Sequence, residues 1–173
     1  ITGKGNPDIQ KCLKEIREYE CISRVPEVST SSICNVSDIL PEQKDRNISF
    51  VKGRENKDKS VGKYKVALID YGAKANIGRL LQKHGCDVTY FPWNATSGEI
   101  IDFNPEGIML SNGPGDPKDC HESIDAIKNL YQTDIPIFGI CLGHQLMALA
   151  SGFDTFKLRY GHRGVNHPVR NEL

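Results

Sequence analysis

The sequence has no excess of either charge and no long hydrophobic run. Its 173 residues include 22 basic and 22 acidic side chains, so a strong electrostatic attraction to nucleic acid or to an anionic lipid surface is not expected. Its apolar runs are short, whereas a transmembrane helix needs roughly 20 apolar residues. The chain opens with Ile1 and shows no basic segment followed by an apolar one, so no secretory signal is expected. These absences predict a cytoplasmic protein without nucleic-acid or membrane partners.

The cysteines lack the spacing of a metal site or of a disulfide framework. No two of them are separated as in a C-x-x-C motif, so zinc ligation is not expected. They are spread along the chain, and a cytoplasmic environment keeps thiols reduced. We therefore expect no metal and at least five ordinary packing or surface thiols among the six cysteines: Cys12, Cys21, Cys34, Cys86, Cys120 and Cys141.

The composition divides the chain into two unequal parts near residue 63. Residues 1–62 hold 4 of the 16 glycines, and residues 63–173 hold the other 12. In the first part, Asn6 and Pro7 form a helix start, and Ile9, Leu13 and Ile16 follow at helical spacing, which predicts one short amphipathic helix. Residues 25–40 are weakly patterned. Of the 22 residues from 42 to 63, 11 are charged, which is typical of a solvated linker.

The second part alternates short apolar runs with helical patterns. This alternation predicts an α/β fold, doubly wound around a mainly parallel sheet. In such a sheet the ligand lies at the carboxyl ends of the strands, so functional residues should lie in the loops that follow them. The predicted strands are residues 64–69, 88–91, 107–110, 135–140 and 155–158, and the predicted helices are residues 76–84, 97–102, 119–131 and 142–150.

A glycine–cysteine–glycine pattern stands where one predicted strand runs directly into a helix. Cys141 is flanked at two residues' distance by Gly139 and Gly143, as in a nucleophile elbow with sulfur in place of oxygen. A side chain at either glycine would crowd the sharp turn. Cys141 would then stand at a helix N-terminus, where free N–H groups favour a negative charge. Taken alone, the pattern is equally consistent with a tightly packed turn.

A second loop follows the preceding predicted strand. Residues 112–117 read Asn-Gly-Pro-Gly-Asp-Pro, a turn stiffened by two prolines in which two glycines leave the backbone bare. Such a backbone can donate N–H groups to a developing negative charge, although a lone loop of this composition is more often only a connection. Together, the two loops would bring a thiol and an oxyanion hole to the same edge of the sheet.

Three runs of the sequence resemble a known family. They are Gly113-Pro-Gly-Asp-Pro117, Gly139-Ile-Cys-Leu-Gly-His-Gln145 and Tyr160-Gly-His-Arg-Gly-Val-Asn-His-Pro168. They are similar to motifs of the class I, triad-type glutamine amidotransferases, and most closely to the small, glutamine-hydrolysing subunits of carbamoyl phosphate synthetases. The resemblance implies three segments: residues 1–41 as the end of an N-terminal domain, 42–62 as a linker, and 63–173 as an amidotransferase domain that is incomplete at its C-terminus.

The resemblance also implies a reaction and its residues. Cys141 matches the nucleophile that attacks the side-chain amide of L-glutamine. Gly113 and Leu142 match the oxyanion donors, and Gly113, Gly115, Leu142 and Gln145 match positions that contact the substrate. The ammonia would pass to a large synthetase subunit, or to a fused synthetase domain, which uses ATP, Mg and bicarbonate. We expect no cofactor in this chain, and the product, carbamoyl phosphate, would serve arginine and pyrimidine biosynthesis.

One part of the family's machinery is missing from the sequence. The family's general base and its orienting carboxylate lie in a His-x-Glu motif downstream of the elbow, and no such motif precedes Leu173. His144 is on the same predicted helix as Cys141, which carries its side chain along the helix. His162 and His167 suit a loop or a subunit contact, and His84 a helix end. We therefore expect a fragment with negligible glutaminase turnover, in which Cys141 still reacts with a glutamine-like electrophile.

Two other interpretations stay open on the sequence alone. The chain could be another class I amidotransferase or cysteine hydrolase of the same fold, although Gln145 and the loop at residues 112–117 argue against a peptidase. It could also be an inert scaffold module, which the intact elbow of Gly139, Cys141 and Gly143 disfavours. Ammonia release from glutamine that a large ATP-binding subunit stimulates would favour the carbamoyl phosphate synthetase subunit over another enzyme of this fold. Selective alkylation of Cys141 would argue against the inert scaffold.

Overall fold

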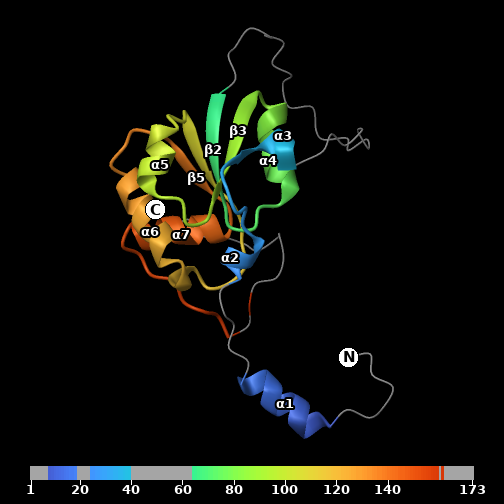
Figure 1. The fold of residues 1–173 in the computed structure, drawn as a ribbon. Coiled ribbons are helices and arrows are strands. Elements are labelled where there is room, and N and C mark those ends of the chain that lie inside the picture. The colour runs from blue at the N-terminus through green and yellow to red at the C-terminus, as the bar shows by residue number, and fades with distance from the viewer. Residues whose placement is uncertain (1–7, 19–23, 40–63, 160, 162–173) are drawn as a thin grey trace.

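A computed structural model of the chain describes residues 8–18, 24–39, 64–159 and 161. Its centre is a five-stranded sheet in the order β1-β3-β2-β4-β5 (Figure 1). Neighbouring strands run parallel, except that β1 pairs antiparallel with β3 at one edge. The strands are β1 (Cys34–Asn35), β2 (Tyr64–Asp70), β3 (Cys86–Pro92), β4 (Gly107–Leu110) and β5 (Ile137–Gly139). The predicted doubly wound α/β fold is confirmed.

Helices cover both faces of the sheet, as the alternation of the strand side chains requires. On one face, Val66, Leu68 and Val88 pack with residues of α3 and α4. On the other face, Ala67, Ile69 and Ile108 pack with residues of α5, α6 and α7 (Figure 1). The helices are α1 (Ile9–Glu18), α2 (Val25–Val28), α3 (Val36–Ile39), α4 (Ala75–Lys83), α5 (Ser97–Asp102), α6 (His121–Leu130) and α7 (Leu142–Ala150), with a 3-10 turn at Pro117–Asp119.

Most of the predicted elements are confirmed, and one is wrong. The strands expected at residues 64–69, 88–91, 107–110 and 135–140 all form, as do the helix near the N-terminus and the four helices of the second part. Residues 155–158 form no strand. A strand is stable only when it pairs with a neighbour, and within the described ranges these residues have no ladder to join. The side chain of Phe156 is 82% exposed.

The weakly patterned residues 25–40 contain three short elements, α2, β1 and α3. Val25 and Val36 are fully buried, the first in the cluster under α5, α6 and α7 and the second in the cluster under α4. Elements of two to four residues have no detectable periodicity, so packing against the sheet must hold them in place. The proposed domain division stays a prediction, and the charged segment 42–62 lies outside the described residues.

The burial of these two valines predicts a measurable contribution to stability. Val25→Ala and Val36→Ala each remove two methyl groups from a filled site, so each should lower the free energy of unfolding by about 2 kcal/mol. Val28→Ala, on the same helix as Val25 but 48% exposed, should cost less than about 1 kcal/mol. Urea denaturation of the three variants checks this. Equal effects at all three positions would contradict the docking of residues 25–39.

Candidate active site

Cys141 occupies a sharp turn between β5 and α7. Its backbone has φ 53° and ψ −107°, a region that residues with side chains rarely adopt and that is found mainly where surrounding structure enforces it. Hydrogen bonds hold the turn on both sides: Ile140 N–H donates to Leu110 O at 2.9 Å, and Gly143 N–H donates to Ser111 O at 3.1 Å. The predicted strand-to-helix turn around Cys141 is thus present. Hydrogen bonds to the end of β4 hold its unusual backbone conformation in place.

The two glycines of the pattern are required by close backbone approaches. A Cβ atom on Gly139 would lie 2.7 Å from Gly143 C and from His144 N. A Cβ atom on Gly143 would lie 2.7 Å from Leu110 C and Leu110 Cβ. Backbone atoms cannot move aside as a flexible side chain can, so both positions exclude any larger residue. The glycines let α7 begin directly against the end of β4.

The thiol of Cys141 differs from the other described thiols in its exposure. Cys141 is exposed, Cys120 is buried, and Cys12, Cys34 and Cys86 are half-buried. Burial raises the pKa of the Cys86 thiol, which lowers the fraction of reactive thiolate there. Cys21 lies outside the described residues. Cys141 is therefore the exposed residue among the described cysteines.

The glycine–proline loop after β4 lies against the start of α7. A Cβ atom on Gly113 would be 2.8 Å from Tyr71 Cβ and 2.7 Å from Leu142 Cδ2, so Gly113 is in contact with the residue that follows Cys141. Among the hydrogen bonds between described residues, none is donated by the N–H of Gly113 or of Leu142. The structure thus brings together the two predicted oxyanion residues with both N–H groups available.

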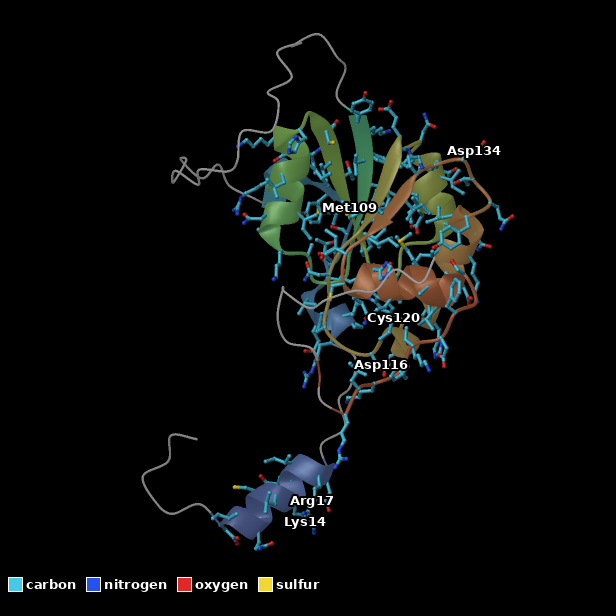
Figure 2. All side chains as sticks on the ribbon, turned by 180° about the vertical axis from the view of Figure 1, so that it is seen from behind. Lys14, Arg17, Met109, Asp116, Cys120 and Asp134 are labelled. Atoms are coloured by element: carbon cyan, nitrogen blue, oxygen red, sulfur yellow. The ribbon has the colours of Figure 1, made fainter. Side chains whose placement is uncertain are left out.

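The outer half of the same loop has its own anchors. Gly115 is exposed with φ 94°, and the Asp116 carboxylate accepts a hydrogen bond from Lys118 N–H at 3.0 Å. Lys118 Nζ lies 2.7 Å from Asp154 Oδ1, and this lysine holds the pKa of Asp154 below its usual value. The loop is therefore tied to the segment that follows α7. Figure 2 shows Asp116 at the carboxyl ends of the strands, far from Asp134 at the opposite end of the sheet.

The loops after β2 and β4 are joined by polar side chains that the sequence reasoning did not single out. The Asn112 side chain donates to Gly72 O at 2.9 Å and accepts from Lys74 N–H at 3.0 Å. Tyr71 N–H donates to Ser111 Oγ at 2.9 Å. The signal that could have found them is their place in the sequence, since Ser111 and Asn112 are the first two residues after β4.

Asp70 is the last residue of β2, and it hydrogen-bonds to a further segment of the chain. Its buried carboxylate accepts hydrogen bonds from Gly72 N–H at 2.9 Å, Ala73 N–H at 2.7 Å and Thr30 N–H at 2.8 Å. A buried carboxylate with three N–H donors is well compensated for the loss of water. Asp70 thereby fixes the loop after β2 and fastens residue 30 of the first part to it.

Among the described residues, neither Gln145 nor a histidine hydrogen-bonds to the sulfur of Cys141. Gln145 is exposed one helical turn after Cys141, and its N–H donates to Cys141 O at 3.1 Å. His84 ends α4, as predicted, before Gly85 with φ 87°. His121 and His144 are exposed on helices, whereas His162 and His167 lie outside the described residues. Within the described part of the chain, no base is hydrogen-bonded to Cys141.

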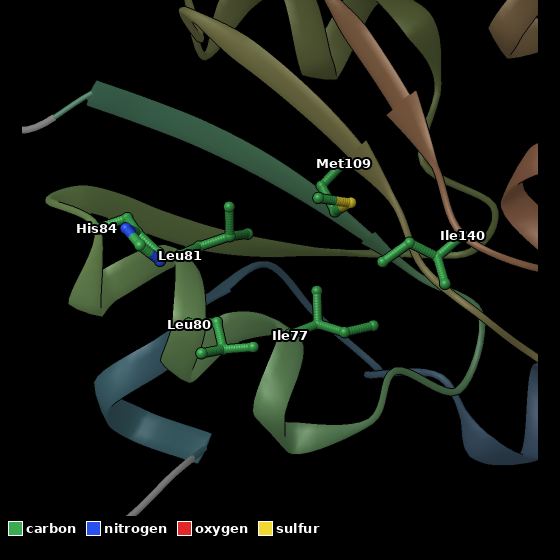
Figure 3. A pocket seen from close by; sticks show the side chains of 6 residues that line it. All are labelled: Ile77, Leu80, Leu81, His84, Met109 and Ile140. Carbon is green, nitrogen blue, oxygen red and sulfur yellow. The ribbon is translucent and has the colours of Figure 1, made fainter. Parts of the chain in front are cut away.

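A hydrophobic cavity of about 190 Å³ lies between α4 and the sheet, and one of its lining residues, Ile140, directly precedes Cys141 (Figure 3). It is almost entirely apolar, so it lacks the polar partners that a glutamine side chain and its charged α-groups need. The elbow and its loops therefore remain the candidate site for a polar substrate. The cavity is lined by Ile77, Leu80, Leu81, His84, Met109 and Ile140.

The described residues offer neither a metal site nor a membrane-spanning helix. Among them, no group of three or more His, Cys, Asp or Glu side chains is arranged to hold a metal ion. None of the helices that they form has the length and apolarity required to cross a bilayer.

Comparison with known proteins places this site in a family. The family model described as glutamine amidotransferase class-I matches residues 67–173. A carbamoyl phosphate synthase small chain of Bacillus cereus is 43% identical over 99% of this chain and 47% of its own length. The corresponding small chain of Listeria monocytogenes is 58% identical over 61% of this chain and 29% of its own length. The chain thus spans about half the length, or less, of these curated relatives.

A solved structure supports the fold independently. A crystal structure of a Thermoplasma acidophilum protein, named as one of the subunits of GMP synthase, superimposes with a TM-score of 0.53 at 24% identity. The match covers 60% of this chain and 53% of that one. At this identity the likeness concerns the fold alone. The family model, in contrast, covers most of the described sheet together with the cysteine elbow, and on that ground the chain belongs to the class-I glutamine amidotransferases.

Proposed function

We propose that the chain supplies the glutamine-hydrolysing site of a carbamoyl phosphate synthase small chain. The observation that carries the proposal is the exposed Cys141, held at φ 53° at the start of α7, together with the contact between Gly113 and Leu142, whose N–H groups donate no hydrogen bond to a described residue. The 43% identity to a carbamoyl phosphate synthase small chain along 99% of the chain supports this member of the family. The full reaction belongs to a protein about twice as long as this chain.

The reaction at this site is an acyl transfer from nitrogen to sulfur and then to water. The Cys141 thiolate attacks the side-chain amide carbon of glutamine, and the former carbonyl oxygen becomes an oxyanion. The amide nitrogen takes up the proton that the thiol had given to a base, the C–N bond breaks, and ammonia leaves. Water cleaves the resulting thioester, which releases glutamate and restores the thiol. The chain needs no cofactor for these steps.

The surrounding residues stabilise the charge and position the substrate. The N–H groups of Gly113 and Leu142 donate to the oxyanion, where each such donor typically contributes about 2.7 to 4 kcal/mol to lowering the barrier. Gly115 offers bare backbone beside the substrate, and the exposed Gln145 contacts the glutamine from one turn along α7. A base from elsewhere in the full-length protein completes the site, because no described residue hydrogen-bonds to the sulfur.

The ammonia passes from this site to a large synthetase partner, either a separate subunit or a fused domain. That partner uses ATP, Mg and bicarbonate to form carbamoyl phosphate. The proposal places the protein in the cytoplasm, as part of arginine and pyrimidine biosynthesis.

Substitution of the nucleophile tests the chemistry. In the full-length protein, Cys141→Ser should lower glutaminase turnover by at least about 1,000-fold, because a serine hydroxyl is far less ionised than a thiol at neutral pH. In the unsubstituted protein, iodoacetamide should alkylate Cys141 before Cys86 and Cys120, as mapped by mass spectrometry. Equal labelling of Cys141, Cys86 and Cys120, together with the same ammonia release from Cys141→Ser as from the unsubstituted protein, would favour the inert scaffold.

The synthetase partner provides the second test. Ammonia release from glutamine should rise when the large ATP-binding subunit, ATP and bicarbonate are added, and carbamoyl phosphate should form. Replacing that subunit with the synthetase component of another amidotransferase is the matched control. Stimulation by the control component but not by the large subunit would assign the chain to a different class-I enzyme.

The 173-residue chain by itself provides the third test. Because no described residue hydrogen-bonds to the Cys141 sulfur as a base would, the glutamine turnover of this chain should stay at background level, while a chloroketone analogue of glutamine should still modify Cys141. Steady-state ammonia assays and mass spectrometry check both halves. Turnover comparable to that of the full-length protein would show that the residues within this chain complete the catalytic site.

A further inference from the structure

Ser111 occupies a position from which it can orient one of the two oxyanion donors. It follows β4 directly and is fully buried. Its hydroxyl donates a hydrogen bond to Asn112 O at 2.8 Å and accepts one from Tyr71 N–H at 2.9 Å. Both hydrogen-bonding directions of the hydroxyl are thus used, and neither is shared with solvent.

The acceptor of that hydrogen bond belongs to the same peptide unit as the Gly113 N–H. A trans peptide is planar, so Asn112 O and the N–H of Gly113 point in opposite directions. When the Ser111 hydroxyl holds Asn112 O toward the end of β4, the Gly113 N–H is directed away from it. Asn112 is itself fixed through its side chain to Gly72 O and Lys74 N–H.

The other side of this peptide is also confined. Gly113 packs between Tyr71 and Leu142, and Pro114 follows it, which restricts the backbone of the preceding residue. A glycine nevertheless has more accessible backbone conformations than any other residue. The Ser111 hydroxyl is therefore the polar contact that selects one orientation of the Asn112–Gly113 peptide.

We propose that Ser111 is a positioning residue for glutamine hydrolysis, whose buried hydroxyl fixes the Asn112–Gly113 peptide so that the Gly113 N–H faces the developing oxyanion. The inference rests on the proposed function. Ser111 acts through Gly113 and does not touch the substrate. Loss of its hydroxyl should therefore affect the transition state, in which the oxyanion exists, and leave the binding of neutral glutamine largely unchanged.

The test compares two buried serines in the full-length protein assembled with its synthetase partner. Ser111→Ala should lower kcat for ammonia release roughly 10- to 100-fold with KM changed less than about threefold, which approaches the loss of one oxyanion donor. The control is Ser123→Ala. Ser123 is 1% exposed and donates to Trp93 O at 2.8 Å. The Ser123→Ala variant loses an equivalent buried hydroxyl, but its kcat should stay within about threefold of that of the unsubstituted protein.

Alkylation separates positioning from general damage. Iodoacetamide forms a C–S bond at Cys141 and expels iodide, so no charge develops on a carbonyl oxygen and the oxyanion hole is not used. The alkylation rate of Ser111→Ala should therefore match that of the unsubstituted protein within about twofold. A kcat equal to that of Ser123→Ala, or an alkylation rate that falls in parallel with kcat, would overturn the proposal.

Two further measurements keep the test decisive. If Ser111→Ala does not fold, Ser111→Cys replaces it, because its S–H is a weaker donor of similar reach; an unchanged kcat in that variant overturns the proposal. Failure of the proposed function has a different signature. In that case the unsubstituted protein and Cys141→Ser release ammonia equally, whereas failure of this inference alone leaves Cys141→Ser inactive and Ser111→Ala fully active.

Discussion

The direct contact between the start of α7 and the end of β4 is the constraint on which the site depends. Gly143 N–H bonds to Ser111 O, and Gly143 approaches Leu110 too closely for any side chain. Because this contact fixes where the helix begins, it also fixes the unusual backbone of Cys141, which lies between the strand and the helix. Without it the turn could relax to an ordinary conformation, and Cys141 would lose its fixed position at the start of α7.

The sheet, its flanking helices and the elbow were predictable because each has a strong local signal. Residues 66–69 of β2 and 108–110 of β4 are continuous apolar runs, as expected where both faces of a parallel sheet are covered. The glycines around Cys141 mark a turn whose crowding can be worked out from backbone sterics alone. The loop from Asn112 to Pro117 could be placed at the same edge because consecutive parallel strands end there.

The remaining features depend on contacts between distant residues, which local patterns do not carry. Val25 and Val36 lie in elements too short to show a period, and only the sheet surface gives them their conformation. The strand expected at residues 155–158 shows the converse, since a β-prone run without a neighbouring strand to pair with stays irregular. Ser111 and Asn112 could be seen in the sequence, but their hydrogen bonds to Tyr71, Gly72 and Lys74 span about forty positions.

The compositional boundary near residue 63 does not separate two folding units, because Thr30 N–H donates a hydrogen bond to Asp70 across it. Cleavage at the compositional boundary near residue 63 would strip one donor from a carboxylate that cannot reach water and would open the space filled by Val25 and Val36. The smallest unit that keeps these contacts therefore begins upstream of residue 25. A substitution that loosens residues 25–36 would also disturb the loop after β2, because Thr30 and that loop share the Asp70 carboxylate.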